Sequence, residues 1–388
     1  MVSFDNTENA FKAKTNSELN RSYWLFKLIG NPALVKLGAN FGPLALNVGF
    51  KGLIKSTIFK QFVGGETIHD CSVTIGQLGK YNIGTILDYS VEGKESEEDF
   101  DHCLEETLET IKMAKNDANI PFCVFKVTGL ARFDLLQKAS TKQTFTETES
   151  QEWVRVKNRV SKICSSAYEN NQAIFIDAEE SWIQPAIDDL ANENMALYNK
   201  TKAIVYNTYQ FYRHDRLSYL TESIKQGKTN GYHVGAKLVR GAYMEKERKR
   251  AQEMGYQSLI QSSKEASDKD YNEALKLCTE NIEAIGLCAG THNEKSSLYL
   301  VELMQQKNIS PVDKRIYFSQ LFGMSDHISY NLSLNNYNVA KYVPYGPVKE
   351  VLPYLIRRAQ ENTSVKGQTG RELNLIMKEK KRRSGLKK

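Results

Sequence analysis

Apolar and polar positions follow two alternating patterns from about residue 82 to residue 362. Short apolar runs rich in β-branched and aromatic residues predict buried strands, and the longer amphipathic stretches between them predict helices. We predict eight strands, at Ile83–Tyr89, Phe122–Thr128, Ala173–Asp177, Ala203–Thr208, Val234–Val239, Ile285–Ala289, Ile316–Leu321 and Val339–Val343. The predicted helices include Glu97–Asn116, Trp153–Asn170, Trp182–Asn199, Lys295–Lys307 and Val348–Asn362.

Strict alternation of strands and helices indicates parallel strands joined by right-handed crossovers. Eight such units in about 265 residues match the size of a (β/α)8 barrel, which typically takes about 250 residues. The alternative is a doubly wound sheet, which normally shows a G-x-G-x-x-G turn after its first strand, and the sequence has no such turn. We therefore predict an α/β protein with a distorted (β/α)8, TIM-type barrel.

We predict three segments along the chain. Residues 1–80 are interpreted as a helical arm that covers the barrel, residues 81–372 as the barrel, and residues 373–388 as a basic tail. The longest charge-free stretch near the start, Leu37 to Phe50, is too short to span a membrane and contains Pro43.

Composition adds further limits. With 388 residues, 41% of them hydrophobic and 25% charged, the chain has the composition of a globular protein. Asp5 and Glu8 stand among the first residues, and no secretory or transit signal is evident. The six cysteines are scattered without a C-x-x-C pair, which predicts reduced thiols and no metal site. We expect a cytoplasmic protein, with peripheral contact at the inner face of the membrane as a further hypothesis.

The net charge of +6 is concentrated at the end of the chain. From Lys378 onward, seven basic residues and Glu379 leave a net charge of +6, so the rest of the chain is close to neutral. A neutral body argues against a nucleic-acid-binding face, which needs a basic stripe on a folded domain. The tail is either solvated or attracted to an anionic membrane, where each Lys or Arg contributes about 1 kcal/mol.

Polar residues recur where the predicted strands end. In barrels of this type the chemistry lies at the carboxyl ends of the strands. A buried polar group without a partner costs roughly 1–3 kcal/mol, so core packing does not explain the recurrence, whereas a large polar ligand would. These residues are Asp88, Lys126, Asp177, Asn207, Lys237 with Arg240, Thr291, His292, Asn293, Gln320 and Tyr342.

Two adjacent arginines, Arg357 and Arg358, lie on the last predicted helix. An arginine fork binds a carboxylate through two parallel hydrogen bonds, and two forks would hold a small carboxylate rigidly. The competing interpretation is that both arginines are solvated and form helix-surface ion pairs with Glu361, which stabilise the helix by about 0.2–0.5 kcal/mol. The helix alone leaves both interpretations open.

The residues above lie in a series of short motifs. The segment KLVRGAYMEKER runs from Lys237 to Arg248, and around it stand VFKVTGL, IFIDAEE, GTHN, QLFGM, KYVPYG and YLIRRAQEN. These motifs resemble the proline dehydrogenase family: the first is similar to the family's most distinctive motif, and the others occur in the family order. The resemblance extends from about Ile83 to Glu372 and implies non-covalent FAD across the strand ends of the barrel. It implies oxidation of L-proline to 1-pyrroline-5-carboxylate by hydride transfer to flavin N5, the first step of proline catabolism, with electrons passed to a membrane quinone.

The resemblance also assigns roles by matching position. Lys126 and the two arginines would hold the proline carboxylate, two tyrosines would pack on its ring, and Asp177 would join the polar network near Lys126. The matched catalytic positions are Lys126, Asp177, Tyr243, Tyr342, Arg357 and Arg358. The positions that match flavin contacts are Asn207, Lys237, Val239, Gly241, Ala242, Thr291, His292, Asn293, Gln320 and Glu361.

Two positions depart from the pattern of the bifunctional bacterial members. Lys237 stands where many members carry Arg, and Asn207 where they carry Gln. Both keep hydrogen-bond donors, so flavin binding is still expected, although the bonding around flavin N5 differs. The rest of the chain is too short for the aldehyde dehydrogenase module of those relatives, which implies a monofunctional form.

Three alternatives stay open. Within the family, the close competitor is hydroxyproline dehydrogenase, although the ring of Tyr342 leaves little room for a 4-hydroxyl group. A different class is a Schiff-base aldolase barrel, in which Lys126 or Lys237 attacks a carbonyl. A third class is a non-catalytic membrane-surface protein that binds through the tail and the arm.

Overall fold

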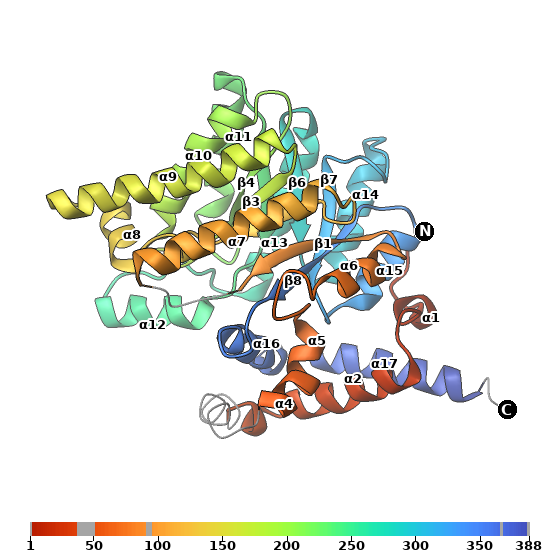
Figure 1. Ribbon diagram of the computed structural model, residues 1–388. Helices are drawn as coiled ribbons and strands as arrows, with labels where there is room; N and C mark the ends of the chain where they lie inside the picture. Colours follow the sequence, from red (N-terminus) through yellow and green to blue (C-terminus); the bar gives the residue numbers. More distant parts are fainter. Residues whose placement is uncertain (1, 37–50, 91–94, 365–367, 386–388) are drawn as a thin grey trace. The chain divides into compact units, whose positions relative to one another are not determined.

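Eight parallel strands form a closed barrel in the order β1 to β8 (Figure 1), which confirms the predicted (β/α)8 fold. The computed structural model describes residues 2–36, 51–90, 95–364 and 368–385, so the charge-free stretch from Leu37 to Phe50 lies outside the described residues. The strands are β1 (Ile83–Tyr89), β2 (Phe122–Phe125), β3 (Ala173–Ile176), β4 (Val205–Gln210), β5 (Val234–Val239), β6 (Ile285–Gly290), β7 (Ile316–Leu321) and β8 (Val339–Tyr345).

Helices follow the strands as the amphipathic pattern predicts, with ends set by capping. The helix predicted from Trp153 begins earlier, at Glu147, because Thr146 and Glu149 form a capping box. In the described part of the chain, no helix is both long and apolar enough to cross a membrane. The helices after β1 are α7 (Glu97–Lys115), α8 (Phe133–Ser140), α9 (Glu147–Glu169), α10 (Gln184–Tyr198), α11 (Arg216–Asn230), α12 (Met244–Met254), α13 (Lys264–Glu280), α14 (Glu294–Gln306), α15 (Asp326–Leu334), α16 (Leu352–Ser364) and α17 (Gln368–Gly385).

Contacts divide the chain into two compact units. Unit 1 consists of residues 1–92 and 320–388, and unit 2 of residues 93–319. The division predicted at residues 80 and 372 follows the sequence rather than contacts and stays a prediction. Helix α17 runs across the second of these points.

Aromatic rings identify the interior of the barrel in unit 2. Phe122 of β2 stacks on Phe175 of β3 with ring centroids 4.4 Å apart, and meets Tyr317 of β7 edge-on at 4.8 Å. Since β2 and β7 are not neighbours in the barrel, the contact between Phe122 and Tyr317 crosses the interior. Tyr206 of β4 joins these rings, and a Cβ on Gly286 would lie 2.2 Å from its hydroxyl, so glycine is needed there. Alternation along each strand then identifies the other interior positions.

The N-terminal arm packs with the C-terminal helices in unit 1. Its helices enclose a core that includes Phe26, Phe62, Leu375 and Ile376. Helices α2 and α17 lie side by side (Figure 1). In its described residues the arm contains α1 (Thr7–Ala10), α2 (Asn16–Ile29), α4 (Lys51–Ile54), a π-helical turn (Lys55–Phe59), α5 (Lys60–Phe62) and α6 (Ser72–Gly79).

The basic end of the chain is the second half of α17 rather than a free tail. Glu379 is fully buried and accepts hydrogen bonds from Arg382 and Arg383. Arg383 also donates to the carbonyl oxygens of Phe11 and Lys14. The expectation of a solvated tail is therefore wrong for these two arginines, because they join α17 to the arm.

Candidate active site

Lys126, Asp177 and Lys237 meet on the interior face of the barrel, at β5 and just beyond β2 and β3. We call this group the Asp177 triad. Lys237 donates a hydrogen bond to one carboxylate oxygen of Asp177, and the ammonium of Lys126 lies 3.9 Å from the other oxygen. The side chains of Lys126, Asp177 and Lys237 are 17%, 12% and 7% exposed. Two ammonium groups thus share one carboxylate, an arrangement that suits an anionic ligand.

Asn207 lies on the helix-facing side of β4 instead of the interior. Its side-chain amide donates to Asp188 of α10 at 2.8 Å, and its oxygen accepts from the N–H of Thr208. The interior positions of β4 are Thr208 and Gln210, because side chains alternate along a strand. Gln210 donates to the carbonyl of Glu179 at 2.7 Å. Asn207 therefore faces α10, and its predicted flavin contact stays a prediction; Gln210 is an interior residue that sequence reasoning missed.

The residues after β5 and β6 form a hydrogen-bonded group around Arg240. Arg240 donates to Asp268 at 2.6 Å and to the hydroxyl of Thr291 at 2.7 Å. The oxygen of Asn293 caps α14 by accepting from two backbone N–H groups of its first turn. His292, between these two residues, is half-buried. Thr291 and Asn293 therefore hold the loop in place, and their predicted flavin contacts stay predictions.

The segment between β5 and α12 presents main chain to solvent. Gly241 has a φ of +129°, and a Cβ there would meet the ring of Tyr212 at 2.5 Å, so only glycine fits. Gly241 and Ala242 are exposed, and Tyr243 is half-buried at the start of α12. Val239 precedes them on the interior face of β5. Exposed main-chain groups at the end of a strand suit a polar ligand that lies across it.

Two predicted site residues of unit 1 lie on different faces of their strands. Tyr342 of β8 is 8% exposed and pairs in register with Ile86 of β1. The following interior position on β1 is Asp88, two residues further. Gln320 of β7 is buried, and its side-chain oxygen accepts from the hydroxyl of Ser329 on α15, so it faces the helices. Tyr342 thus has the orientation a ligand contact needs, and Gln320 does not.

Arg357 and Arg358 lie on α16, as the sequence predicts. Arg357 is half-buried, and Arg358 is 6% exposed with its guanidinium 5.0 Å from the ring centroid of Tyr354. The side chain of Glu361 lies outside the described residues. The meeting of these arginines with Lys126 stays a prediction.

A second lysine–aspartate–lysine group was missed by the sequence analysis. The ammonium of Lys341 lies 2.9 Å from one carboxylate oxygen of Asp326, and that of Lys14 lies 3.2 Å from the other. Lys341 also donates to the carbonyl of Met324. Burial opposes ionisation of Asp326, but the two lysines outweigh it and lower the pKa of Asp326 to about 2. We call this group the Asp326 triad; its signal in the sequence is a lysine at a helix-facing position of β8.

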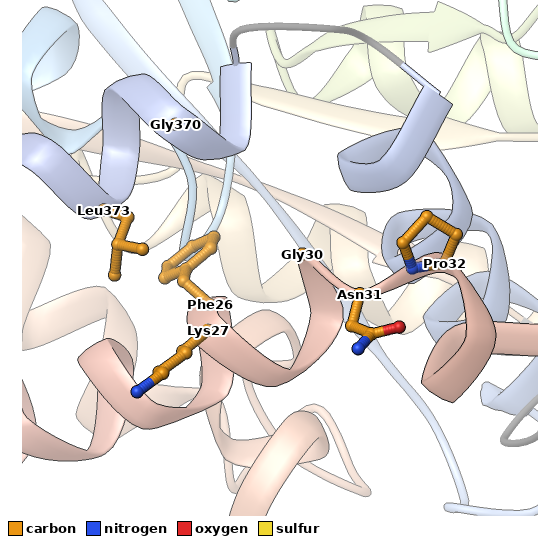
Figure 2. Close-up of a pocket in the computed structure, with 7 residues that line it drawn as sticks. All are labelled: Phe26, Lys27, Gly30, Asn31, Pro32, Gly370 and Leu373. Carbon is orange, nitrogen blue, oxygen red and sulfur yellow. The ribbon is translucent and has the colours of Figure 1, made fainter.

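A hollow of about 490 Å³ lies in unit 1 between α2 and α17 (Figure 2). Phe26 and Leu373 provide apolar walls, and Lys27 lies at its edge. Among the described residues that line it, none belongs to the predicted site. The hollow is therefore separate from the predicted chemistry.

Comparison with known proteins identifies the family. The family model described as proline dehydrogenase matches residues 71–371. The chain belongs to the proline dehydrogenase family. It is 34% identical over 387 residues to proline dehydrogenase 1, mitochondrial, of Dictyostelium discoideum, and the match covers 88% of this chain and 68% of that protein. It is 30% identical over 412 residues to the hydroxyproline dehydrogenase of Xenopus laevis, with 96% and 88% covered.

Solved structures agree with this assignment at the level of the fold. Proline utilization A from Bdellovibrio bacteriovorus matches this chain with a TM-score of 0.74 at 19% identity. The match covers 92% of this chain and 38% of that one, so this chain spans well under half the length of that protein. The family resemblance inferred from the motifs is confirmed, and the protein is an oxidoreductase of this family.

Proposed function

We propose that this protein oxidises L-proline to 1-pyrroline-5-carboxylate with bound FAD, as the first step of proline catabolism. The observation that supports this best is the pair of ammonium groups around Asp177 on the interior face of a barrel that the family model covers. Proline carries a carboxylate beside a ring amine. A cationic group binds the carboxylate, and aromatic rings pack against the methylene groups of the ring.

The residues at the ends of β4 and β5 fit a flavin through their donor chemistry. Lys237 and Gln210 offer side-chain donors on the interior face, and Gly241 and Ala242 offer exposed main chain. When bound, FAD would supply the acceptor for the hydride that leaves C5 of proline. We therefore propose Gln210 in place of Asn207. The other proposed contacts are Val239, Thr291, His292 and Asn293.

The proposed role of the protein is to bind and orient proline. Lys126, Arg357 and Arg358 hold the carboxylate, and Tyr243 and Tyr342 pack on the ring. Holding the reacting atoms in an attack geometry lowers a barrier by several kcal/mol without covalent chemistry from the protein. The cationic surroundings favour the neutral amine that hydride transfer needs, in the same way that nearby cations lower the pKa of a lysine.

Two other functions are weighed against this proposal. Oxidation of hydroxyproline is favoured by the Xenopus relative, and it is opposed by the ring of Tyr342. A Schiff-base aldolase needs a neutral lysine amine. Lys126 and Lys237 are instead both engaged with the carboxylate of Asp177.

One spectroscopic experiment tests the proposed function. The purified protein is expected to show a bound flavin spectrum, and L-proline is expected to bleach it under anaerobic conditions. Bleaching by trans-4-hydroxy-L-proline as fast as by L-proline would favour the hydroxyproline function instead. A colourless protein that FAD does not reconstitute would contradict both the proline and the hydroxyproline functions.

We also propose that the enzyme docks on an anionic membrane and passes electrons to a quinone dissolved there. Support comes from the outer faces of α2 and α17, which we call the α2–α17 patch. Trp24 and Leu28 are 58% and 53% exposed on α2. Lys27 lies 5.0 Å from the ring centroid of Trp24, and Lys380 of α17 lies 4.2 Å from that of Tyr23. Exposed aromatic and basic side chains together suit the interface of an anionic bilayer.

Vesicle flotation tests the α2–α17 patch. The parent protein is expected to float with vesicles that contain phosphatidylglycerol and not with pure phosphatidylcholine. Trp24→Ser and the pair Lys27→Glu with Lys380→Glu should each reduce flotation, and only the parent should reduce a lipid-soluble quinone efficiently. The control is Leu197→Ser, since Leu197 is equally exposed, at 61%, in unit 2. Equal flotation by all variants, or self-association through the patch in ultracentrifugation, would contradict membrane docking.

A further inference from the structure

Glu179 connects the end of β3 to the turn that follows Lys126. Glu179 is 4% exposed, and one oxygen of its carboxylate accepts a hydrogen bond from the backbone N–H of Thr128 at 3.1 Å. The other oxygen bonds the hydroxyl of Thr128. Thr128 is the middle residue of the 3-10 turn Val127–Gly129, which begins directly after Lys126. The carboxylate thus holds the turn through both of its oxygens.

The main chain of Glu179 is itself fixed from two sides. Its N–H donates to the side chain of Gln184 at 2.8 Å, and its carbonyl accepts from Gln210 at 2.7 Å. Two residues earlier, the N–H of Asp177 donates to the carbonyl of Phe125 at 3.0 Å. The segment that carries Asp177 is therefore rigid, and the Glu179 carboxylate joins it to the turn that carries Lys126.

We propose that Glu179 is a positioning residue that holds the Val127–Gly129 turn, keeps Lys126 beside Asp177 and so sets the affinity of the site for the substrate carboxylate. This inference rests on the proposed function for the identity of that carboxylate. Lys126 lies 3.9 Å from Asp177, at the edge of ion-pair distance, so a small movement of the turn changes the position of its ammonium.

The same carboxyl makes the site sensitive to pH. Burial raises the pKa of Glu179 to about 7, and Glu180 adds to the rise, while Thr128 and Lys126 oppose it. Two charged residues of α12 face the same segment: Lys246 is paired with Glu180, and Glu247 accepts hydrogen bonds from Ser181. As pH rises through 7, Glu179 becomes negative, and the positive charge available to a substrate carboxylate beside Lys126 falls.

Substitution of Glu179 tests the proposal with two readouts. Glu179→Ala should raise KM for L-proline about tenfold while kcat and flavin content change little. Pyrrolidine, the same ring without a carboxylate, should show no such change. Glu179→Gln keeps one acceptor and one donor for Thr128, so its KM should match that of the parent below pH 6 and stay constant to pH 8. The parent's KM should rise over the same range.

Hydrogen exchange provides the readout that does not depend on activity. The amide of Thr128 should exchange faster in Glu179→Ala and at the parental rate in Glu179→Gln. The control is Glu152→Gln, which alters another buried carboxylate of unit 2, bonded to Arg132. Unchanged exchange in Glu179→Ala, or a KM change that Gln does not rescue, would overturn the proposal. If the parent does not oxidise proline, the proposed function fails, and the exchange result alone still decides whether Glu179 holds the turn.

Discussion

Asp177 in unit 2 and Asp326 in unit 1 each lie between two lysines, but the surroundings differ. In the Asp326 triad the two ion-pair distances are 2.9 and 3.2 Å, and the side chain of Lys341 is 1% exposed. In the Asp177 triad the ammonium of Lys126 is 3.9 Å away, and its side chain is 17% exposed. We call the first triad closed because both of its ion pairs are short, and the second open because the pair of Lys126 with Asp177 is long. Lys14 and Lys126 themselves are similarly exposed, at 21% and 17%.

The difference shows that residue types alone do not separate a structural charge group from a binding site. Lys341 faces the helices and gives a further hydrogen bond to the carbonyl of Met324. Lys126 and Lys237 face the interior of the barrel and share the carboxylate of Asp177. Side-chain direction, which follows the two-residue period of a strand, decides which role a lysine takes.

Removing the carboxylate of the closed triad should have the largest effect. Asp326→Ala leaves two ammonium groups without their partner, one of them buried, and should lower the free energy of unfolding by about 3–5 kcal/mol. Thermal and urea denaturation measure this. The matched control is Lys14→Met, which removes the more exposed lysine, 21% exposed, and should cost less. Equal stability of Asp326→Ala and the parent would show that the triad is not structural.

The same variant predicts a pH dependence. The pKa of Asp326 is lowered to about 2 in the folded protein, so its stabilising effect is present above the usual carboxyl pKa and is lost as pH falls toward 2. The difference in stability between the parent and Asp326→Ala should therefore be large at pH 6 and shrink at low pH. A difference that stays constant down to pH 2 would contradict the assignment.

Substitution of the two arginines of α16 tests which charged residues bind the substrate. Arg357→Met and Arg358→Met should each raise the dissociation constant for proline by roughly 10- to 100-fold, since each removes a charge-assisted bond worth about 1.5–3 kcal/mol. Titration of flavin bleaching measures this, and FAD content should not change. Arg315→Met is a control on an arginine that pairs with Asp313 elsewhere. Binding equal to the parent's in both variants would support a solvated pair.

Substituting one lysine of each triad compares the open triad with the closed one directly. Lys126→Met should raise KM for proline about tenfold with little change in melting temperature, because its side chain is the more accessible one. Lys341→Met should lower the melting temperature and leave KM of the folded fraction unchanged. Equal effects of the two substitutions on both measurements would remove the distinction between an open and a closed triad.

The smallest expected effect concerns ring selectivity at Tyr342. Tyr342→Ser should lower kcat/KM for L-proline. It should also reduce the preference of the enzyme for L-proline over trans-4-hydroxy-L-proline, by about 1–3 kcal/mol in relative transition-state free energy. The ratio of kcat/KM for the two substrates measures it. A parent that already oxidises both equally well, or a variant with unchanged selectivity, would remove Tyr342 from the specificity argument.

The fold was largely predictable because hydrophobic periodicity is a local signal. Ile83–Tyr89, Val234–Val239 and Ile316–Leu321 are strands with the predicted bounds. β2 ends at Phe125 instead of Thr128, because the chain turns into the 3-10 segment held by Glu179. The role of α17 was not predictable, because a run of basic residues does not reveal that Arg382 and Arg383 form ion pairs with the buried Glu379 on their own helix.

The residue types of the candidate site were predictable from the sequence. The face of the strand on which each side chain lies was less predictable. Asn207 and Gln210 are both amides near the end of β4, but an offset of three residues places them on opposite faces. Lys341 was missed because the partner that makes it structural, Asp326, lies on the preceding helix. Such pairings depend on packing between elements, which the strand pattern alone does not specify.

Unit 1 is built from both ends of the chain, residues 1–92 and 320–388. During synthesis the arm leaves the ribosome before residues 93–319, and its core partners Leu375 and Ile376 leave after them. The segment from 93 to 319 is complete long before then, and domains generally fold as units while the chain emerges. The arm must therefore wait for α17 before its core is complete, and α2 exposes more apolar surface to the solvent, and to chaperones, until then.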